Sequence, residues 1–395
     1  MAPDEKPYRV YKGGRVKGKV PATPKREART PRKPRSGGGG RIKVKGPGAA
    51  RFSLPRKPPW RRIILLSLLT LVVLFLIWAV VGYFELASGV SDANKRLDPR
   101  AHAALTKQNG LLLSHATNIL VLGTDNAPVN GRTTDNHSDS IMLVRADPSH
   151  HRIAYLSIPR DLVVDIPGVG NSKINYAMQS GGVPLAIRTV HDLTGQPINH
   201  VIVVNFGQFK DLIDSLGGIT VDVPDAVLSD RFDCPYATAA RCEQWKGWRF
   251  RKGPQHMTGE QALIYSRIRV NQLNPAESSD FFRVARQQAV TQATLAKFTS
   301  FGTLLGAPFH ASSWVKPLAT DLSTMQLIEL GWVKFRSSSG NALHCRLGGD
   351  FGNGGTGAPS EDNPLTILMW LGKSAPQLPT TTFGPGCARG HDLGT

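Results

Sequence analysis

The sequence predicts an α/β protein: a three-layer α-β-α domain with a central mixed sheet, preceded by one transmembrane helix and a disordered basic tail. Three observations lead to this prediction. Short β-rich runs alternate with helical patterns after about residue 116, an uncharged apolar stretch precedes them, and most of the positive charge lies before that stretch. The chain has 395 residues, of which 41% are hydrophobic, so it can bury a sizeable core and is not wholly disordered.

Five runs in the second part of the chain have the composition of strands, because they are β-rich and end at Gly, Pro or Asp. They cover residues 118–123, 139–147, 152–158, 200–206 and 219–223. Helical patterns cover residues 184–193, 207–216, 281–298 and 324–335, and residues 348–364 have the composition of a loop. Thr258 and Gln261 form a capping-box pattern that opens a further helix to about Tyr265. This alternation favours α/β layers around a central sheet.

Residues 60–84 are predicted to form the transmembrane helix. The 22 residues from 63 to 84 carry no charge, and at a rise of about 1.5 Å per residue they span about 33 Å, which matches a bilayer core. A buried core helix is usually shorter and interrupted by polar positions. The apolar part of a cleaved signal peptide is usually about 7 to 15 residues long and does not follow such a long N-terminal segment. Trp60, Trp78 and Tyr83 lie near the ends, where aromatic rings favour the interface.

The flanking charges predict the orientation of this helix. Four basic residues lie between positions 56 and 62, whereas Glu85 and Asp92 follow the helix. Basic residues favour the cytoplasmic side, so the N-terminus is expected in the cytoplasm and everything after about residue 85 outside. The protein is therefore expected in the cell membrane as a single-pass protein with an extracytoplasmic domain.

The N-terminal tail, residues 1–59, is predicted to be disordered and cytoplasmic. Residues 1–62 contain 20 Lys and Arg against 3 Asp and Glu, which accounts for +17 of the net charge of +19. Attraction to anionic membrane lipid, worth about 1 kcal/mol per basic residue near the surface, and a simple topology signal explain this charge equally well. Nucleic-acid binding is not expected, because no fold or aromatic stacking pattern accompanies the charge.

Four cysteines lie in the part expected outside, where thiols tend to be oxidised. The favoured pairing joins Cys234 to Cys242 across a short loop and Cys345 to Cys387 near the C-terminus, although two other pairings remain open. A zinc site is less favoured, because no Cys-x-x-Cys occurs and the histidines are not at ligand spacing.

Two aspartates follow or begin predicted neighbouring strands. Asp125 lies just beyond the first run, at an edge where ligands of open α/β sheets commonly bind, and Asp139 begins the second. Two such carboxylates can hold Mg²⁺ together with phosphate oxygens of a substrate. The alternative is that one caps a turn and the other merely starts a strand.

Polar and basic residues elsewhere supply a candidate anion site. The candidates are Arg160, Arg267, Arg269, Arg283 and Gln287. Arg283 and Gln287 are four residues apart, so they share one face of a helix, whereas Arg267 and Arg269 share a face only in an extended chain. Guanidinium groups make planar, bidentate contacts to phosphate, and several of them would repel one another without a polyanion between them. Each one alone could be a solvated surface residue.

Eight motifs occur in the order seen in the LytR-CpsA-Psr family, which the chain resembles over about residues 116–300. They are residues 118–125 (NILVLGTD), 137–144 (HSDSIMLV), 156–161 (LSIPRD), 173–175 (KIN), 203–209 (VVNFGQF), 216–224 (LGGITVDVP), 258–269 (TGEQALIYSRIR) and 283–288 (RVARQQ). The resemblance implies a phosphotransferase of cell-wall assembly. Such an enzyme moves a glycopolymer from a polyprenyl-pyrophosphate carrier to peptidoglycan with help from Mg²⁺.

The resemblance also assigns roles to individual residues. Asp125 and Asp139 match the metal-associated aspartates, and the four arginines with Gln287 match the pyrophosphate-binding residues. His137 replaces an Arg that the family often has, so one forked contact becomes a single hydrogen bond. Arg160 and the two aspartates are expected to be catalytic, through positioning and charge neutralisation. Asp161 is a candidate for the base that activates the attacking hydroxyl, with a strand-end cap as the favoured alternative.

The expected organisation therefore has five parts. They are the tail (1–59), the transmembrane helix (60–84), a membrane-proximal connector (85–115), the catalytic domain (116–300) and a C-terminal part that completes or covers it (301–395). A hydrolase that uses water as the acceptor, and a non-catalytic polyprenyl-phosphate-binding regulator, remain open as alternatives. The glycopolymer could be teichoic acid, arabinogalactan or capsule.

Overall fold

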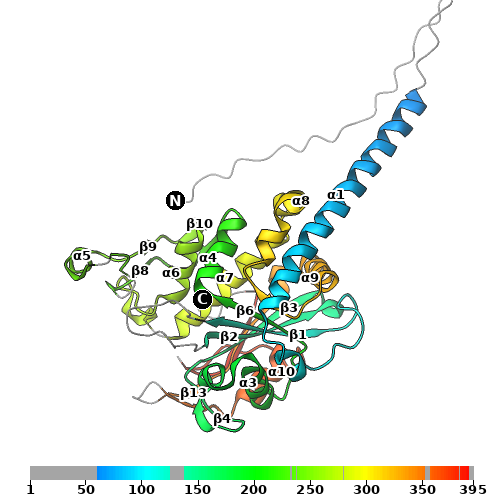
Figure 1. Cartoon of the computed structure of the whole chain (residues 1–395). Helices are drawn as coiled ribbons and strands as arrows, with labels where there is room; N and C mark the ends of the chain where they lie inside the picture. Colours follow the sequence, from blue (N-terminus) through cyan, green and yellow to red (C-terminus); the bar gives the residue numbers. More distant parts are fainter. Residues whose placement is uncertain are drawn as a thin grey trace, which may run out of the picture. The chain divides into compact units, whose positions relative to one another are not determined.

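A mixed sheet of seven strands forms the centre of the computed structural model (Figure 1). The order across the sheet is β11 (Ala319–Thr320), β6 (His200–Asn205), β1 (Thr117–Thr124), β2 (Ser138–Asp147), β3 (Arg152–Ile158), β12 (Leu343–Arg346) and β15 (Gly386–Arg389). The pairs β1–β6 and β3–β12 are parallel, and the other pairs are antiparallel. The predicted α/β fold with a mixed central sheet is confirmed.

The structure describes residues 60–124, 138–231, 234–236, 238–278, 280–351, 356–381 and 383–390, with the backbone alone at positions 139, 206, 277, 280 and 281. The predicted disordered tail, Asp125 and His137 lie outside these ranges.

One face of the sheet packs against a continuous hydrophobic core and is called here the filled face. The other, called the open face, forms part of the wall of a cavity. Alternate residues of each strand point to opposite faces. Leu120, Leu143 and Leu156 therefore join one hydrophobic cluster, while Val144 and Tyr155 join another on the opposite face. The first cluster is the larger and also contains residues of the C-terminal region.

Helices cover both faces, which gives the three layers (Figure 1). On the filled face lie α2 (Ala101–Ala104), α3 (Tyr176–Thr194) and α10 (Asn363–Trp370). On the other side lie α4 (Phe206–Ser215), α6 (Gly259–Arg267), α7 (Asp280–Phe298), α8 (Phe301–Val315) and α9 (Thr324–Arg336). The predicted capping box is present at the start of α6, where the Thr258 side chain accepts from the Gln261 backbone N–H.

The predicted transmembrane segment, residues 60–84, is the N-terminal part of one continuous helix of 37 residues, α1 (Trp60–Arg96). Among the described residues, it is the one helix long and apolar enough to cross a membrane, and its most apolar window is not buried against the protein. This helix indicates a single-pass membrane anchor. The helix continues beyond residue 84 because the connector has no breaker there, and its last turns are buried in the domain through Gly89, Val90 and Ala93.

Three local predictions differ from the structure. Strand β7 (Ile219–Val223) pairs with β10 (Gly253–Met257) outside the central sheet. Helix α3 begins before Pro184, because Gly182, with φ of 65°, joins two helical segments and Pro184 opens the second. The predicted loop at 348–364 contains the short pair β13 (Gly349–Asp350) and β14 (Ala358–Pro359).

The remaining strands and α-helix are short, and two disulfide bonds cross-link the chain. The short elements are β4 (Val163–Ile166), β5 (Gly170–Lys173), β8 (Val227–Leu228), α5 (Ala239–Gln244) and β9 (Arg249–Phe250). Cys234 is bonded to Cys242 next to α5, and Cys345 of β12 is bonded to Cys387 of β15. This is the pairing that the sequence favoured. Because β11, β12 and β15 all come from beyond residue 300, the C-terminal part completes the central sheet.

Candidate functional site

A cavity of about 1520 Å³ lies between the open face of the sheet and the helices that cover it. Its walls come from β1, β2 and β6 of the sheet and from α4, α7, α8 and α9. Residues Trp78, Gly82 and Leu86 of α1 close one side. Pockets for small molecules usually measure about 300 to 1,000 Å³, so this cavity suits a longer ligand.

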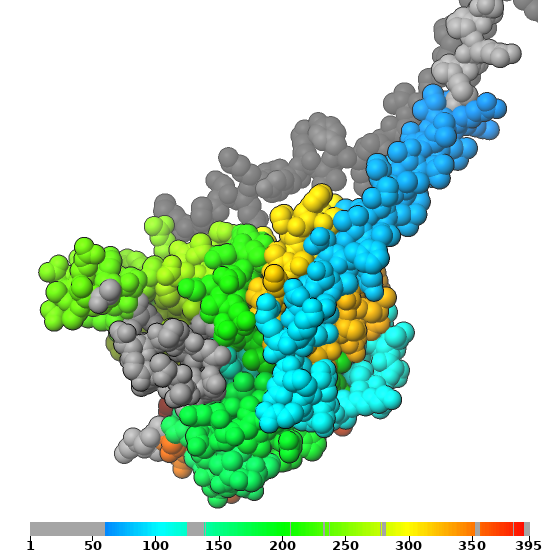
Figure 2. All heavy atoms as spheres, viewed as in Figure 1, coloured from blue at the N-terminus to red at the C-terminus, as the bar shows by residue number. Residues whose placement is uncertain are grey.

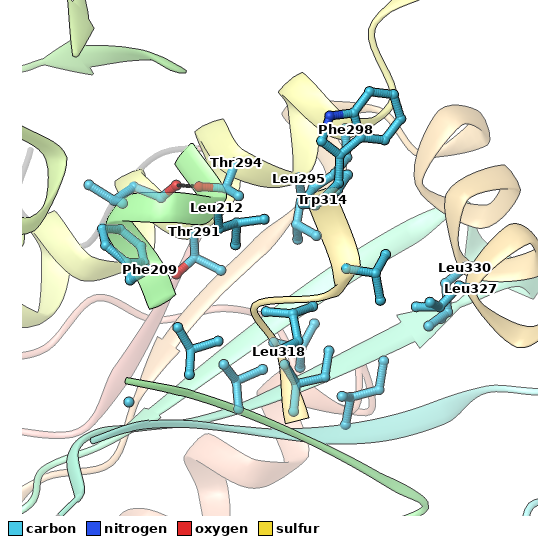
Figure 3. Close-up of a pocket in the computed structure, with 18 of the residues that line it drawn as sticks. Phe209, Leu212, Thr291, Thr294, Leu295, Phe298, Trp314, Leu318, Leu327 and Leu330 are labelled. Atoms are coloured by element: carbon cyan, nitrogen blue, oxygen red, sulfur yellow. Dashed lines mark hydrogen bonds between the residues drawn. The ribbon is translucent and has the colours of Figure 1, made fainter. Parts of the chain in front are cut away.

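Most of the cavity wall is apolar. Figure 3 shows aliphatic and aromatic side chains that project into it from several helices. Those labelled there include Phe209, Leu212, Leu295, Phe298, Trp314 and Leu330. Because these residues also contact the neighbouring hydrophobic clusters, their composition does not distinguish them from core residues. The position of this chamber could therefore not be assigned from the sequence.

The polar residues of the cavity wall include every predicted anion-binding side chain. Arg160, Arg267, Arg269, Arg283 and Gln287 all line the same cavity. They come from three separate stretches of the chain, which supports the prediction that these stretches converge. Their roles in binding remain predictions.

Local structure explains how α6 and the segment after it present two of these arginines. Arg267 is the last residue of α6, and Ile268 leaves the helix with φ of −58° and ψ of 126°, so Arg269 continues in an extended chain. Arg286 of α7 donates a hydrogen bond of 2.9 Å from Nη2 to the carbonyl of Ile268. This bond fixes the peptide between the two arginines.

Helix α7 is held against the sheet by a buried amide. Gln288 donates from Nε2 to Oγ of Ser157 at 2.7 Å and to the carbonyl of Cys345 at 3.0 Å. This register presents Arg283, only 5% exposed, and Gln287 to the cavity. Ser140 of β2 donates from Oγ to Oε1 of Gln287 at 3.2 Å, which holds the amide at the N-terminal end of β2.

Asp161 lies at the cavity wall in an ion-pair network. Its Oδ1 accepts a hydrogen bond from Lys173 Nζ at 2.9 Å, and its Oδ2 accepts one from Arg160 Nε at 3.4 Å. Burial alone would raise the pKa of the Asp161 carboxyl, but the hydrogen bond from Lys173 and the charges of Arg160 and Lys173 outweigh it and hold the pKa below its ordinary value. A carboxylate held in this way is a weak base, so its evident role is to orient the two cations.

The two predicted metal-binding aspartates can be placed only in part. Asp125 lies outside the described residues. The backbone of Asp139 belongs to β2 at a bulge, because Gly123 pairs with Ser140 whereas Thr124 pairs with Ser138. Bulges are common beside active sites, where they redirect a side chain. Since Gly123 and Ser140 both line the cavity, the bulge between β1 and β2 borders it.

The cavity wall also includes polar residues to which the sequence assigned no role. Among them are Ser140, Lys173, Asn175 and Ser266. The first three lie within motifs that carried the family resemblance, and Ser266 lies between Tyr265 and Arg267 in another. Membership of a motif was thus the available signal, but it did not distinguish a side chain that faces a ligand from one that supports the fold.

Comparison with known proteins agrees with this architecture. The sequence profile of the LytR_cpsA_psr family matches residues 80–342. The chain is 31% identical over 294 residues to the polyisoprenyl-teichoic acid--peptidoglycan teichoic acid transferase TagU of Bacillus mycoides (strain KBAB4), which covers 70% of this chain and 88% of that protein. It is 34% identical over 219 residues to the protein of the same name from Bacillus anthracis (strain CDC 684 / NRRL 3495), over 55% of this chain and 64% of that one.

A solved structure shows the same fold. The structure described as TagT bound to LI-WTA superposes with a TM-score of 0.50 at 25% sequence identity, over 67% of this chain and 94% of that one. The predicted resemblance is confirmed, and so is the prediction that the chain is an enzyme, since its relatives are named transferases. Because two thirds of its length is matched by the family profile, this chain belongs to the LytR_cpsA_psr family.

Proposed function

We propose that the protein transfers a glycopolymer phosphate from a polyprenyl-pyrophosphate carrier to a sugar hydroxyl of peptidoglycan during cell-wall assembly. The observation that carries the proposal is a single cavity with two kinds of wall: an apolar chamber and a group of arginines. A ligand that fits both must combine a long apolar chain with a compact polyanion. The names of the relatives, which are teichoic acid transferases, favour a teichoic acid as the polymer.

The arginines would bind the diphosphate. Arg283 is almost fully buried, and a cation in such a place gains more from an anionic ligand than a solvated one does. Arg160 is the most suitable group to neutralise charge in the transition state, because Asp161 holds its guanidinium from one side and the cavity lies beside it. Loss of one such contact typically costs about 2.7 to 4 kcal/mol, a factor of about 10² to 10³ in rate.

The reaction is a phosphoryl transfer. The oxygen of the acceptor hydroxyl forms a bond to the phosphorus next to the glycopolymer, and the bond from that phosphorus to the bridging oxygen breaks. Polyprenyl phosphate leaves with the bridging oxygen, and the hydroxyl proton is released to water. Positioning and charge neutralisation supply most of the catalysis in such reactions.

Asp125 and Asp139 would hold Mg²⁺, which neutralises phosphate oxygens when it is bound. The donor chemistry fits, because carboxylate oxygens are hard ligands. The backbone also fits, because the bulge between β1 and β2 brings Asp139 beside the end of the strand that Asp125 follows. This assignment rests on the family resemblance and on the strand pairing.

The membrane places the enzyme near its substrate. The basic residues before α1 favour a cytoplasmic N-terminus, so the domain with the cavity lies outside the cell. The carrier lipid and the peptidoglycan acceptor are then both within reach.

The test is an assay of the full-length protein in lipid nanodiscs with a lipid-linked glycopolymer donor, with and without peptidoglycan. Release of polyprenyl phosphate that requires peptidoglycan, together with covalent attachment of the polymer, is the expected result. Equal release without an acceptor would instead identify a hydrolase, and donor binding without release would identify a lipid-binding regulator.

A second test probes the apolar chamber. Leu295→Trp adds bulk in its wall and is expected to raise KM more for donors with long prenyl chains than for those with short ones. Leu365→Trp, on an exposed surface of α10, is the matched control. Equal effects on both donors would argue against a tail-binding chamber.

A further inference from the structure

Helix α8 is apolar on its outer surface, where a water-exposed helix is normally polar. Phe301, Leu305 and Phe309 are 76%, 52% and 77% exposed. They are spaced by four residues, so they form one stripe along the helix. The helix contains no Asp, Glu, Lys or Arg, and Lys297 is the one such residue between positions 287 and 315.

The cavity accounts for the inner surface of α8 but not for this stripe. Leu304, Ala307 and Ala311 face inwards and line the chamber. The three stripe residues are not part of its wall. Large exposed apolar patches mark contacts with a membrane or with another protein. The position of α8 relative to α1 indicates which of the two covers this stripe.

Helices α1 and α8 lie side by side (Figure 2, blue and yellow). They run in the same direction, because residue numbers rise together along the contacts between them. Trp78 Nε1 donates to the carbonyl of Leu305 at 3.1 Å. Further along both helices, a Cβ on Gly89 would lie 2.7 Å from the Cα of Ser312. Only glycine permits that approach, and such close packing through small residues is typical of membrane helices.

These contacts set the depth of α8 in the membrane. Trp78 lies six residues before the end of the uncharged stretch at Phe84, which corresponds to about 9 Å along a helix. The hydrogen bond from Trp78 therefore places Leu305 at the level of the outer part of the span. Phe301 lies one turn earlier in a helix parallel to α1, so it lies deeper still.

We propose that the N-terminal half of α8 is inserted in the leaflet next to the catalytic domain, with Phe301, Leu305 and Phe309 in contact with lipid acyl chains. The bilayer is the occupant that the geometry favours, because the stripe continues the lipid-exposed surface of α1. The depth of Leu305, about 9 Å below the outer end of the span, lies within the range of about 5 to 10 Å to which interfacial helices bury their apolar face. Lys297 limits the insertion to a depth from which its ammonium group reaches the lipid headgroups.

The insertion has a consequence for the substrate, which rests on the proposed function. Trp78 and Gly82 of α1 and Leu304 and Ala307 of α8 line the cavity together. The apolar chamber thus borders the two helices that are in the membrane. A polyprenyl carrier would enter it sideways from the bilayer, and its chain would not cross water.

The test of insertion does not depend on activity. The four native cysteines form two disulfides, so one introduced cysteine can be labelled with an environment-sensitive nitrobenzoxadiazole dye. Leu305→Cys and Phe309→Cys are compared with Val169→Cys, which lies between β4 and β5 and is also exposed. The full-length protein is used in nanodiscs with and without doxyl-labelled lipid.

Labels at 305 and 309 are expected to show blue-shifted emission and a loss of intensity with doxyl lipid, whereas the label at 169 shows neither. If 305 and 309 behave like 169, the stripe faces water and the proposal is wrong. A blue shift without doxyl quenching would mean that a second copy of the chain covers the stripe, which also overturns the proposal.

Activity then tests the route of the substrate. Phe309→Asp is expected to slow transfer from a donor embedded in the bilayer and to leave transfer from a short-chain donor in detergent unchanged. Val169→Asp is the matched control. Equal rates of the two variants with the bilayer donor would refute sideways entry, whereas absence of transfer by the unmodified protein would refute the proposed function instead.

Discussion

Lys173 donates a hydrogen bond of 2.9 Å from Nζ to Oδ1 of Asp161, a residue twelve positions earlier that follows a different strand. The bond joins the end of β5 to the segment after β3. Because Asp161 also accepts from Arg160, it holds two cations at the wall of the cavity. Its negative charge lets both of them stay there when no anionic ligand is bound.

This network predicts a pH-dependent contribution to stability. The pKa of Asp161 is lower in the folded protein than its ordinary value of 3.8, so its contribution is fully present above that value and is lost as the pH falls through the folded pKa. Asp161→Asn is expected to lower the free energy of unfolding by about 1 kcal/mol near neutral pH, a modest effect because Lys173 is partly exposed. Urea unfolding should show this difference vanish in strong acid.

The control for this measurement is Asp165→Asn, on the exposed side of β4. It removes an equal charge without touching Lys173 or Arg160. If Asp161→Asn lowers the free energy of unfolding by the same amount at all pH values, the loss does not come from the charge of Asp161, and the predicted ion-pair contribution is wrong.

Arg160→Ala is expected to keep the fold and lose transfer. Its guanidinium lines the cavity, and loss of one contact to developing charge typically lowers the rate by a factor of about 10² to 10³. Arg188→Ala, on an exposed position of α3, serves as the control. Unchanged melting with undiminished ligation of the lipid-linked donor would reject the role of Arg160.

Arg286 is expected to act as a positioning residue. Its hydrogen bond to the carbonyl of Ile268 orients Arg267 and Arg269, and a charged hydrogen bond of this kind contributes about 1.5 to 3 kcal/mol. Arg286→Met should therefore raise KM for the donor by about 10-fold or more with a smaller effect on kcat. Arg286→Lys should recover part of the loss. A fall in kcat alone, or no recovery with Lys, would contradict a positioning role.

The two disulfides are expected to differ in their contribution to stability. Cys345 and Cys387 are 42 residues apart and join two strands of the central sheet, whereas Cys234 and Cys242 are 8 apart. Loop-closure entropy predicts losses of about 4 and about 2.5 kcal/mol respectively when each pair is replaced by Ala. Thermal unfolding of the two double variants measures the loss of stability that each replacement causes. A larger loss for the pair at 234 and 242 would contradict the prediction.

The sequence by itself determined the features that depend on near neighbours. The uncharged stretch at 63–84 predicts a membrane helix, because a helix of 22 mostly apolar residues matches the thickness of a bilayer core and is longer than a typical buried helix. A β-rich composition predicted β1, β2 and β3 within one residue of their observed ends, since β-branched and other apolar residues bounded by Gly, Pro or Asp favour strands. The capping box of Thr258 and Gln261 predicted the start of α6 for the same local reason.

Tertiary structure alone decided what depends on distant parts of the chain. The chamber was not predictable, because Leu295 and Leu330 have the same chemistry whether they fill a core or line a cavity. The convergence of Arg160, Arg267 and Arg283 was a hypothesis until β3, α6 and α7 were placed around one space. The packing of α8 on α1 arises from contacts more than 200 residues apart. The physical reason is that burial and proximity are set by the whole packed chain, whereas periodicity and capping are set within a few residues.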